Sequence, residues 1–162
     1  MKLGSLKDGG RDGTLIVVNR DLSKAVRATD TARTLQAALE DWSNAAPRLN
    51  RVYELLNESH AQTINGEEVF ALDPAALAAP LPRAYEFVDG SAYLPHVERV
   101  RRARGAEVPA SFYTDPLMYQ ATSAGFYGPR DAVQVISEDY GIDLEAEIVV
   151  VTDDVPMAVT PQ

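Results

Sequence analysis

Two short aliphatic runs, at 15–18 and 148–151, are the longest in the chain, and they set the strongest limit on what it can fold into. A membrane-spanning helix needs roughly 20 apolar residues, so neither run can cross a bilayer. Both runs are rich in valine and isoleucine, whose branched side chains favour strands. We therefore expect strands at 14–18 and 142–152, and the second is the strongest strand candidate in the chain.

The first 80 residues predict a small unit of strands and helices. A run rich in Gly and Asp at 7–13 can form a tight hairpin turn, because both residue types tolerate a positive φ. Short strands are expected at 3–6, 14–18 and 24–27. Apolar residues then recur at helical spacing, at Leu35, Ala38, Leu39 and Trp42. We expect Thr29 or Asp30 to cap this helix, and Pro47 to open a second helix at its first turn.

The segments that follow are expected to be less regular. The sequence predicts an exposed loop at 60–68 and an alanine- and proline-rich linker at 73–84. Further elements are expected as a basic helical turn at 98–104, a strand at 115–120 and a turn at 128–131. The fold class is therefore predicted to be α+β, with a small N-terminal domain over 1–78 and a mixed, mostly β domain over 79–162.

Charge and composition exclude several classes of protein. The chain has 15 Lys and Arg against 24 Asp and Glu, a net charge of −9, so nucleic acid is not an expected partner. The absence of cysteine excludes disulfides, thiolate catalysis and cysteine-based metal sites. No apolar run follows the first lysine, so we expect no signal peptide, no membrane partner and a cytoplasmic location.

Glu145 and Glu147 are the first candidates for chemistry. They stand two residues apart in the predicted strand at 142–152, so both carboxylates would face the same side. Two adjacent buried carboxylates stay ionised only with a cation between them, and oxygen ligands suit Mg²⁺ or Ca²⁺. The alternative is an ordinary strand whose acidic face lies in water.

Asp89 and His96 form the second candidate pair. Asp89 could supply a third oxygen ligand, and His96 could act as a general base, because an unperturbed histidine titrates near working pH. The alternative is purely structural. Asp89 would then form a turn with Gly90, and His96 would lie at the start of a short helix after Pro95.

Taken in order, these residues resemble the fumarylacetoacetate hydrolase family. That family carries an Asp, a His seven residues later and, much further on, a Glu-x-Glu pair, which match Asp89, His96, Glu145 and Glu147. The first 42 residues are also similar to the small N-terminal region of bacterial members. The resemblance covers nearly the whole chain. It implies that residues 79–162 begin a catalytic domain of the family's rolled-sheet type.

The resemblance also implies roles for these residues. Asp89, Glu145 and Glu147 would be ligands of a divalent metal (Mg²⁺ or Ca²⁺, with Mn²⁺ possible), and His96 would activate water. Tyr119 stands where family members place a substrate-contacting tyrosine, although it could equally be a strand tyrosine with a buried ring. The expected activity is hydrolysis of a carbon–carbon bond in a β-diketo acid such as fumarylacetoacetate. The expected partners are this small acid and, at full length, a second copy of the chain.

Three departures and two alternatives remain open. The family has a further Asp ligand and a substrate-binding Lys later in the sequence, so we expect this chain to be an N-terminal portion with little activity. Where some relatives place a Glu partner three residues after the His, this chain has Arg99. The same fold could instead serve a decarboxylase, hydratase or tautomerase of a 2-oxo acid. A non-enzymic acidic binding domain is the other alternative.

Overall fold

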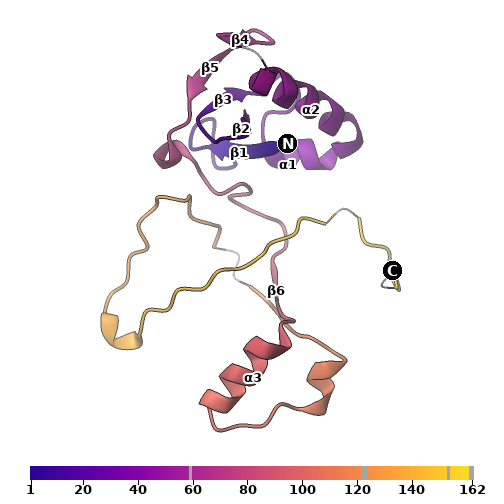
Figure 1. Ribbon diagram of the computed structural model, residues 1–162, viewed down its shortest axis with the longest axis vertical. Coiled ribbons are helices and arrows are strands. Elements are labelled where there is room, and N and C mark those ends of the chain that lie inside the picture. The colour runs from indigo at the N-terminus through magenta and orange to yellow at the C-terminus, as the bar shows by residue number, and fades with distance from the viewer. Residues whose placement is uncertain (59, 122–123, 153, 161–162) are drawn as a thin grey trace.

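Two parts of unequal regularity make up the protein in the computed structural model, which describes residues 1–58, 60–121, 124–152 and 154–160. Figure 1 shows a sheet and two helices gathered at one end, α3 at the other end and β6 between them, with long stretches of irregular chain beside them. Strands and helices are both present, which confirms the predicted α+β class. Within the described residues, no helix is long and apolar enough to cross a membrane.

The N-terminal sheet has five antiparallel strands in the order β1-β2-β3-β5-β4. They are β1 (Lys2–Leu6), β2 (Thr14–Val18), β3 (Lys24–Arg27), β4 (Thr63–Ile64) and β5 (Glu67–Ala71). The first three confirm the strands expected from sequence. The loop expected at 60–68 is wrong, because β4 and β5 form a hairpin there. Its turn is Asn65-Gly66, and both residues have a positive φ (52° and 84°), as a two-residue hairpin requires.

Two helices cover one face of this sheet, α1 (Leu35–Glu40) and α2 (Trp42–Glu58). The cap of α1 is Thr34, whose side chain accepts a hydrogen bond from the Ala37 amide, so the expected caps Thr29 and Asp30 are wrong. Pro47 lies inside α2 and does not open it. The helix extends back past the proline because Ala45 belongs to the same buried stripe as the later apolar residues of α2.

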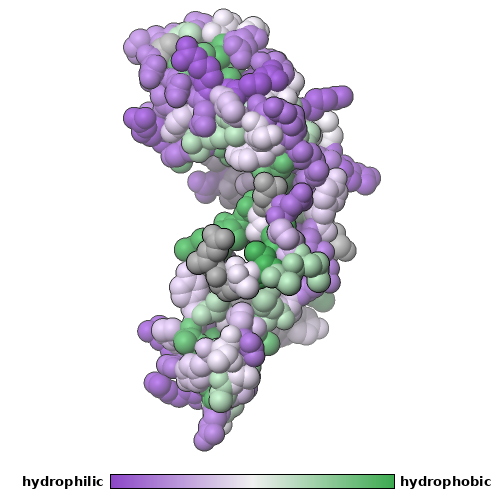
Figure 2. All heavy atoms as spheres, turned by 90° about the vertical axis from the view of Figure 1, so that its right-hand side faces the viewer, coloured by the Kyte–Doolittle hydropathy of each residue, from purple (hydrophilic) through white to green (hydrophobic). Residues whose placement is uncertain are grey.

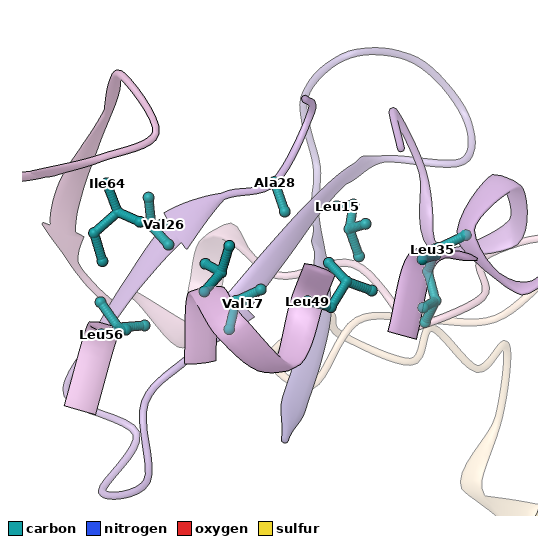
Figure 3. Packing of buried hydrophobic residues seen from close by; sticks show 11 residues of the cluster. Leu15, Val17, Val26, Ala28, Leu35, Leu49, Leu56 and Ile64 are labelled. Carbon is teal, nitrogen blue, oxygen red and sulfur yellow. The ribbon is translucent and has the colours of Figure 1, made fainter. Parts of the chain in front are cut away.

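The core lies on both faces of β2, all five residues of which are buried. Figure 3 shows Leu15 and Val17 of β2 packing with Val26, Leu49 and Leu56 between sheet and helices. The alternate residues of β2 pack on the other face against a second cluster, Leu6, Ala25, Phe70 and Leu77 among its members. Burial on both faces explains why this strand reads as a continuous aliphatic run.

Residues 72–82, which we call the strap, follow β5, and Leu72, Ala76 and Leu77 of this segment pack on the second face of the sheet. The strap contains a short 3₁₀ turn, η1 (Pro74–Ala76), and then pairs with β1 through an isolated bridge between Leu6 and Leu77. Backbone bonds run from the Lys7 amide to the Ala76 carbonyl and from the Ala78 amide to the Ser5 carbonyl, both at 2.9 Å. The strap and the elements before it are called the N-terminal unit below. The expected domain boundary at residue 78 stays a prediction.

The downstream part contains one hairpin and one longer helix. Strands β6 (Val88–Ser91) and β7 (Leu117–Gln120) pair antiparallel, and α3 (Leu94–Ala103) follows β6 directly. Two 3₁₀ turns, η2 (Ala110–Tyr113) and η3 (Glu138–Tyr140), complete the elements described there. The helix overlaps the helical turn expected at 98–104 but begins four residues earlier, at Leu94. Strand β7 lies within the range expected at 115–120, and the turn expected at 128–131 is present, with the Asp131 amide bonded to the Gly128 carbonyl.

The strand expected at 142–152 is wrong. Within the described residues, this segment pairs with no strand, and its apolar side chains face solvent, with Leu144 exposed by 93% and Ile148 by 82%. A strand requires a neighbouring backbone, and β-branched residues cannot supply one by themselves. Figure 2 shows hydrophobic side chains at the surface of the lower, downstream part. The visible face of the N-terminal end is mostly hydrophilic.

Candidate functional site

The hairpin of β6 and β7 places the first two site residues opposite each other. Asp89 and Tyr119 are direct partners in the antiparallel register. The Tyr119 hydroxyl donates a hydrogen bond of 2.7 Å to the Asp89 carboxylate Oδ2. This bond to Asp89 raises the pKa of Tyr119, because ionisation would lose the donor and place a phenolate beside a carboxylate; the negative charges of Glu145 and Glu147 act in the same direction.

Helix α3 supplies His96 from its first turn. The chain leaves β6, turns at Ala92 and Tyr93, and enters the helix with Pro95 near its start, where a missing amide hydrogen costs nothing. The His96 amide bonds to the Tyr93 carbonyl at 3.0 Å, and the neighbouring Val97 is buried. The His96 side chain stays exposed and accessible to solvent. This position suits a base, and it equally suits the structural alternative of a residue at a helix start.

One groove of about 630 Å³ brings the candidates together. Its walls come from the β6–α3 junction and from residues 143–148. Four of the five residues predicted from sequence line it, namely Asp89, His96, Glu145 and Glu147. The fifth, Tyr119, reaches it through its hydrogen bond to Asp89. The sequence alone therefore identified side chains that lie about one groove although up to 58 positions separate them.

The groove also holds two charged residues absent from the predicted site. Asp143 stands two residues before Glu145, so the same alternation that singled out the glutamates would have included it. Arg99 lies one helical turn after His96 and is the only Lys or Arg among the described residues that line the groove. With four carboxylates against one guanidinium, the groove is strongly negative. Such a surface attracts cations.

The groove offers the right donors for a divalent metal but does not gather them. Carboxylate oxygens are the ligands that Mg²⁺ and Ca²⁺ prefer, so the chemistry of the set fits a hard cation. In the described part of the chain, however, no three Asp, Glu or His side chains lie close enough together to hold a metal ion. Glu145 and Glu147 are exposed and belong to the unpaired segment, so the backbone does not fix them against Asp89.

Comparison with known proteins bears on the N-terminal unit. Residues 1–83 match the family model described as fumarylacetoacetase N-terminal domain 2, which covers the whole five-stranded sheet, its helices and the strap. A search of curated proteins finds no match for the chain.

Proposed function

The chain belongs to the fumarylacetoacetate hydrolase family, and we propose that its groove serves the hydrolysis of a carbon–carbon bond in a β-diketo acid such as fumarylacetoacetate. The observation that carries the proposal is the shared groove itself. Asp89, His96 and the Glu145/Glu147 pair come from three separate segments and line one surface. All four residues lie outside the hydrophobic core of the N-terminal unit. Packing of that core therefore does not explain why they line the same groove.

The acidic side of the groove is proposed to hold a divalent metal through Asp89, Glu145 and Glu147. When bound, the metal would supply positive charge that binds the adjacent oxygens of a diketo acid and offsets negative charge as the bond breaks. Tyr119 keeps one oxygen of Asp89 engaged as a hydrogen-bond acceptor, which limits rotation of that carboxylate. The groove's excess of carboxylates supports this role, since a strongly negative surface attracts cations.

His96 is proposed as the general base. It lines the groove together with the acidic residues, and its side chain is exposed to water. In the proposed reaction, His96 takes a proton from water and the resulting hydroxide adds to the substrate carbonyl. The carbon–carbon bond then breaks, one fragment leaves as a carboxylic acid, and the bonding electron pair leaves with the other as an enolate. That enolate accepts the proton that His96 took from water, which restores the base, so atoms and charges balance.

Substitution of the two histidines tests this role. In an active preparation that contains the chain, His96→Ala should lower turnover roughly a hundredfold or more, the usual contribution of a positioned general base. The matched control is His60→Ala, because His60 is the only other histidine and lies in the N-terminal unit. Glu145→Ala should also lower activity, but excess Mg²⁺ or Mn²⁺ should partly restore it, whereas metal should not rescue His96→Ala.

The outcomes separate the hydrolase from its alternatives. Full activity in His96→Ala would overturn the hydrolase mechanism and favour a decarboxylase, hydratase or tautomerase of a 2-oxo acid, which requires no activated water. A normal turnover per folded molecule with a lower melting temperature would assign His96 to the helix start alone.

One observation favours the non-enzymic candidate, an acidic binding domain. Glu145 and Glu147 are exposed, and no three candidate ligands converge within the described residues. Such a domain would bind a cationic partner through diffuse charge, so its binding should weaken steeply with added salt and should not require any single carboxylate. A site for one metal ion would instead depend on each of Asp89, Glu145 and Glu147.

A further inference from the structure

Two connections join the N-terminal unit to the hairpin that carries the groove, and they run side by side. The strap and residues 83–87 lead into β6, and residues 124–131 return toward the N-terminal unit after β7. The Phe126 amide donates a 3.1 Å hydrogen bond to the Pro82 carbonyl, and the rings of Phe87 and Phe126 meet edge to face at 5.1 Å. The returning segment therefore contacts the departing one at two points, at Pro82 in the strap and at Phe87 just before β6.

A tight turn at 128–131 then docks on the N-terminal unit through one carboxylate. Asp131 Oδ2 accepts a 2.7 Å hydrogen bond from the Gly128 amide, which closes the turn from within. Asp131 Oδ1 forms an ion pair with Lys7, which lies 124 positions earlier and also donates to the Ala75 carbonyl at 2.9 Å. Lys7 and the Gly128 amide together lower the pKa of Asp131. The same side chain thus shapes the turn and attaches it.

Two glycines allow the returning segment to approach the strap closely. Gly128 is buried, and a Cβ at this position would overlap the carbonyl oxygen of Leu77. Gly125 has a φ of +90°, and a Cβ there would come within 2.9 Å of the Pro82 carbonyl oxygen. Side chains at these positions would therefore push the segment off the strap, so the residue types suit the docked arrangement.

We propose that residues 125–131 act as a clasp that fixes the β6–β7 hairpin, and with it the groove, in one orientation relative to the N-terminal unit. Asp131 is the positioning residue of this clasp. An exposed ion pair contributes little by itself. Here the pair adds to a close backbone approach, a ring contact and a backbone hydrogen bond between the two connections. The proposal rests on these contacts alone and does not depend on the reaction proposed for the groove.

The absence of cysteine allows the orientation to be measured directly. Spin labels can be placed at Ser43→Cys in α2 and Arg102→Cys in α3, because both side chains are exposed. Pulsed electron paramagnetic resonance of this doubly labelled chain should give one narrow distance distribution. In the same background, Asp131→Ala and Gly128→Val should broaden it. Lys7→Met should broaden it less, and Lys7→Arg should keep it narrow.

A matched control and a folding readout complete the experiment. Asp139→Ala removes an exposed acid of the same downstream part that does not contact the N-terminal unit, so the distribution should not change. Fluorescence of Trp42, the single tryptophan, should show that the N-terminal unit stays folded in every variant. A broad distribution in the parent chain, or an equally narrow one in Asp131→Ala and Gly128→Val, would overturn the proposal.

Discussion

The hydrogen bond from Tyr119 to Asp89 joins two strands across the groove's edge and makes a direct prediction about titration. The raised pKa of Tyr119 means that its phenolate should form at a pH above 10.0, the ordinary pKa of a tyrosine. Ultraviolet titration should therefore show a late component that is lost in Tyr119→Phe. Asp89→Asn should move this component to lower pH, because it removes the negative charge next to the hydroxyl.

The same hydrogen bond should make the stability of the fold depend on pH between 10.0, the ordinary pKa of a tyrosine, and the raised pKa of Tyr119. A group whose pKa is raised on folding stabilises the fold below its unfolded pKa, and that contribution is lost as the pH rises through the raised value.

Tyr85→Phe is the matched control for the ultraviolet titration, since that side chain is 83% exposed, and it should leave the late component intact. A late component that survives in Tyr119→Phe would contradict the assignment.

At the scale of elements, the β4–β5 hairpin depends on backbone conformations that its turn residues adopt. Gly66 has a φ of 84°, and nothing lies within 4 Å of where its Cβ would be, so a substitution there is limited by backbone strain alone. Gly66→Ala should lower the free energy of unfolding by about 1–2 kcal/mol, the cost of a left-handed conformation for a residue with a Cβ. Chemical denaturation followed by Trp42 fluorescence would measure it.

The neighbouring position provides the control for that measurement. Asn65 also has a positive φ, of 52°, but asparagine tolerates this region well. Asn65→Gly should therefore change stability by only a few tenths of a kcal/mol. Equal and large losses in both variants would show that side-chain contacts, and not backbone strain, maintain the turn.

The elements that the sequence predicted well are those whose signals are local. The first three strands, the helical turn expected at 98–104 and the strand expected at 115–120 each overlap an observed element, although α3 begins four residues before the expected helical turn. The extent of α2 was missed because Pro47 is typical of a first turn, whereas the buried stripe that includes Ala45 draws the helix further back. The hairpin at 63–71 was missed although Asn65-Gly66 is a strong turn signal, because the run around it is polar.

The candidate site shows the same division between local and long-range information. The family resemblance carried by Asp89, His96 and the two glutamates predicted a shared site, and these residues line one groove. Among the described residues, however, no three Asp, Glu or His side chains converge. The spacing of Glu145 and Glu147 could not establish a strand, since strand formation depends on a partner backbone elsewhere in the chain. Because the segment has no strand partner within the described residues, both glutamates are exposed. For the same reason they do not converge with Asp89 on one point.

At the scale of the whole molecule, the N-terminal unit should fold without the downstream part. The two hydrophobic clusters on either side of the five-stranded sheet contain residues from the first 81 positions. A fragment of residues 1–83 should therefore unfold in one cooperative transition, with a free energy of about 4–12 kcal/mol for a chain of this size. Calorimetry together with Trp42 fluorescence would check this, and a gradual, non-cooperative loss of signal would contradict it.

The groove carboxylates are proposed to act together as one site for a divalent cation. Isothermal titration of the chain with Mn²⁺ or Mg²⁺ tests this proposal most directly, comparing the parent with Asp89→Asn, Glu145→Gln and Glu147→Gln. The charge-matched control is Glu138→Gln, an acid of the downstream part that lies outside the groove. We predict one ion bound per chain, an affinity at least about tenfold weaker in each groove variant, and no change in Glu138→Gln. No binding to the parent, or equal weakening in all four variants, would contradict the claim.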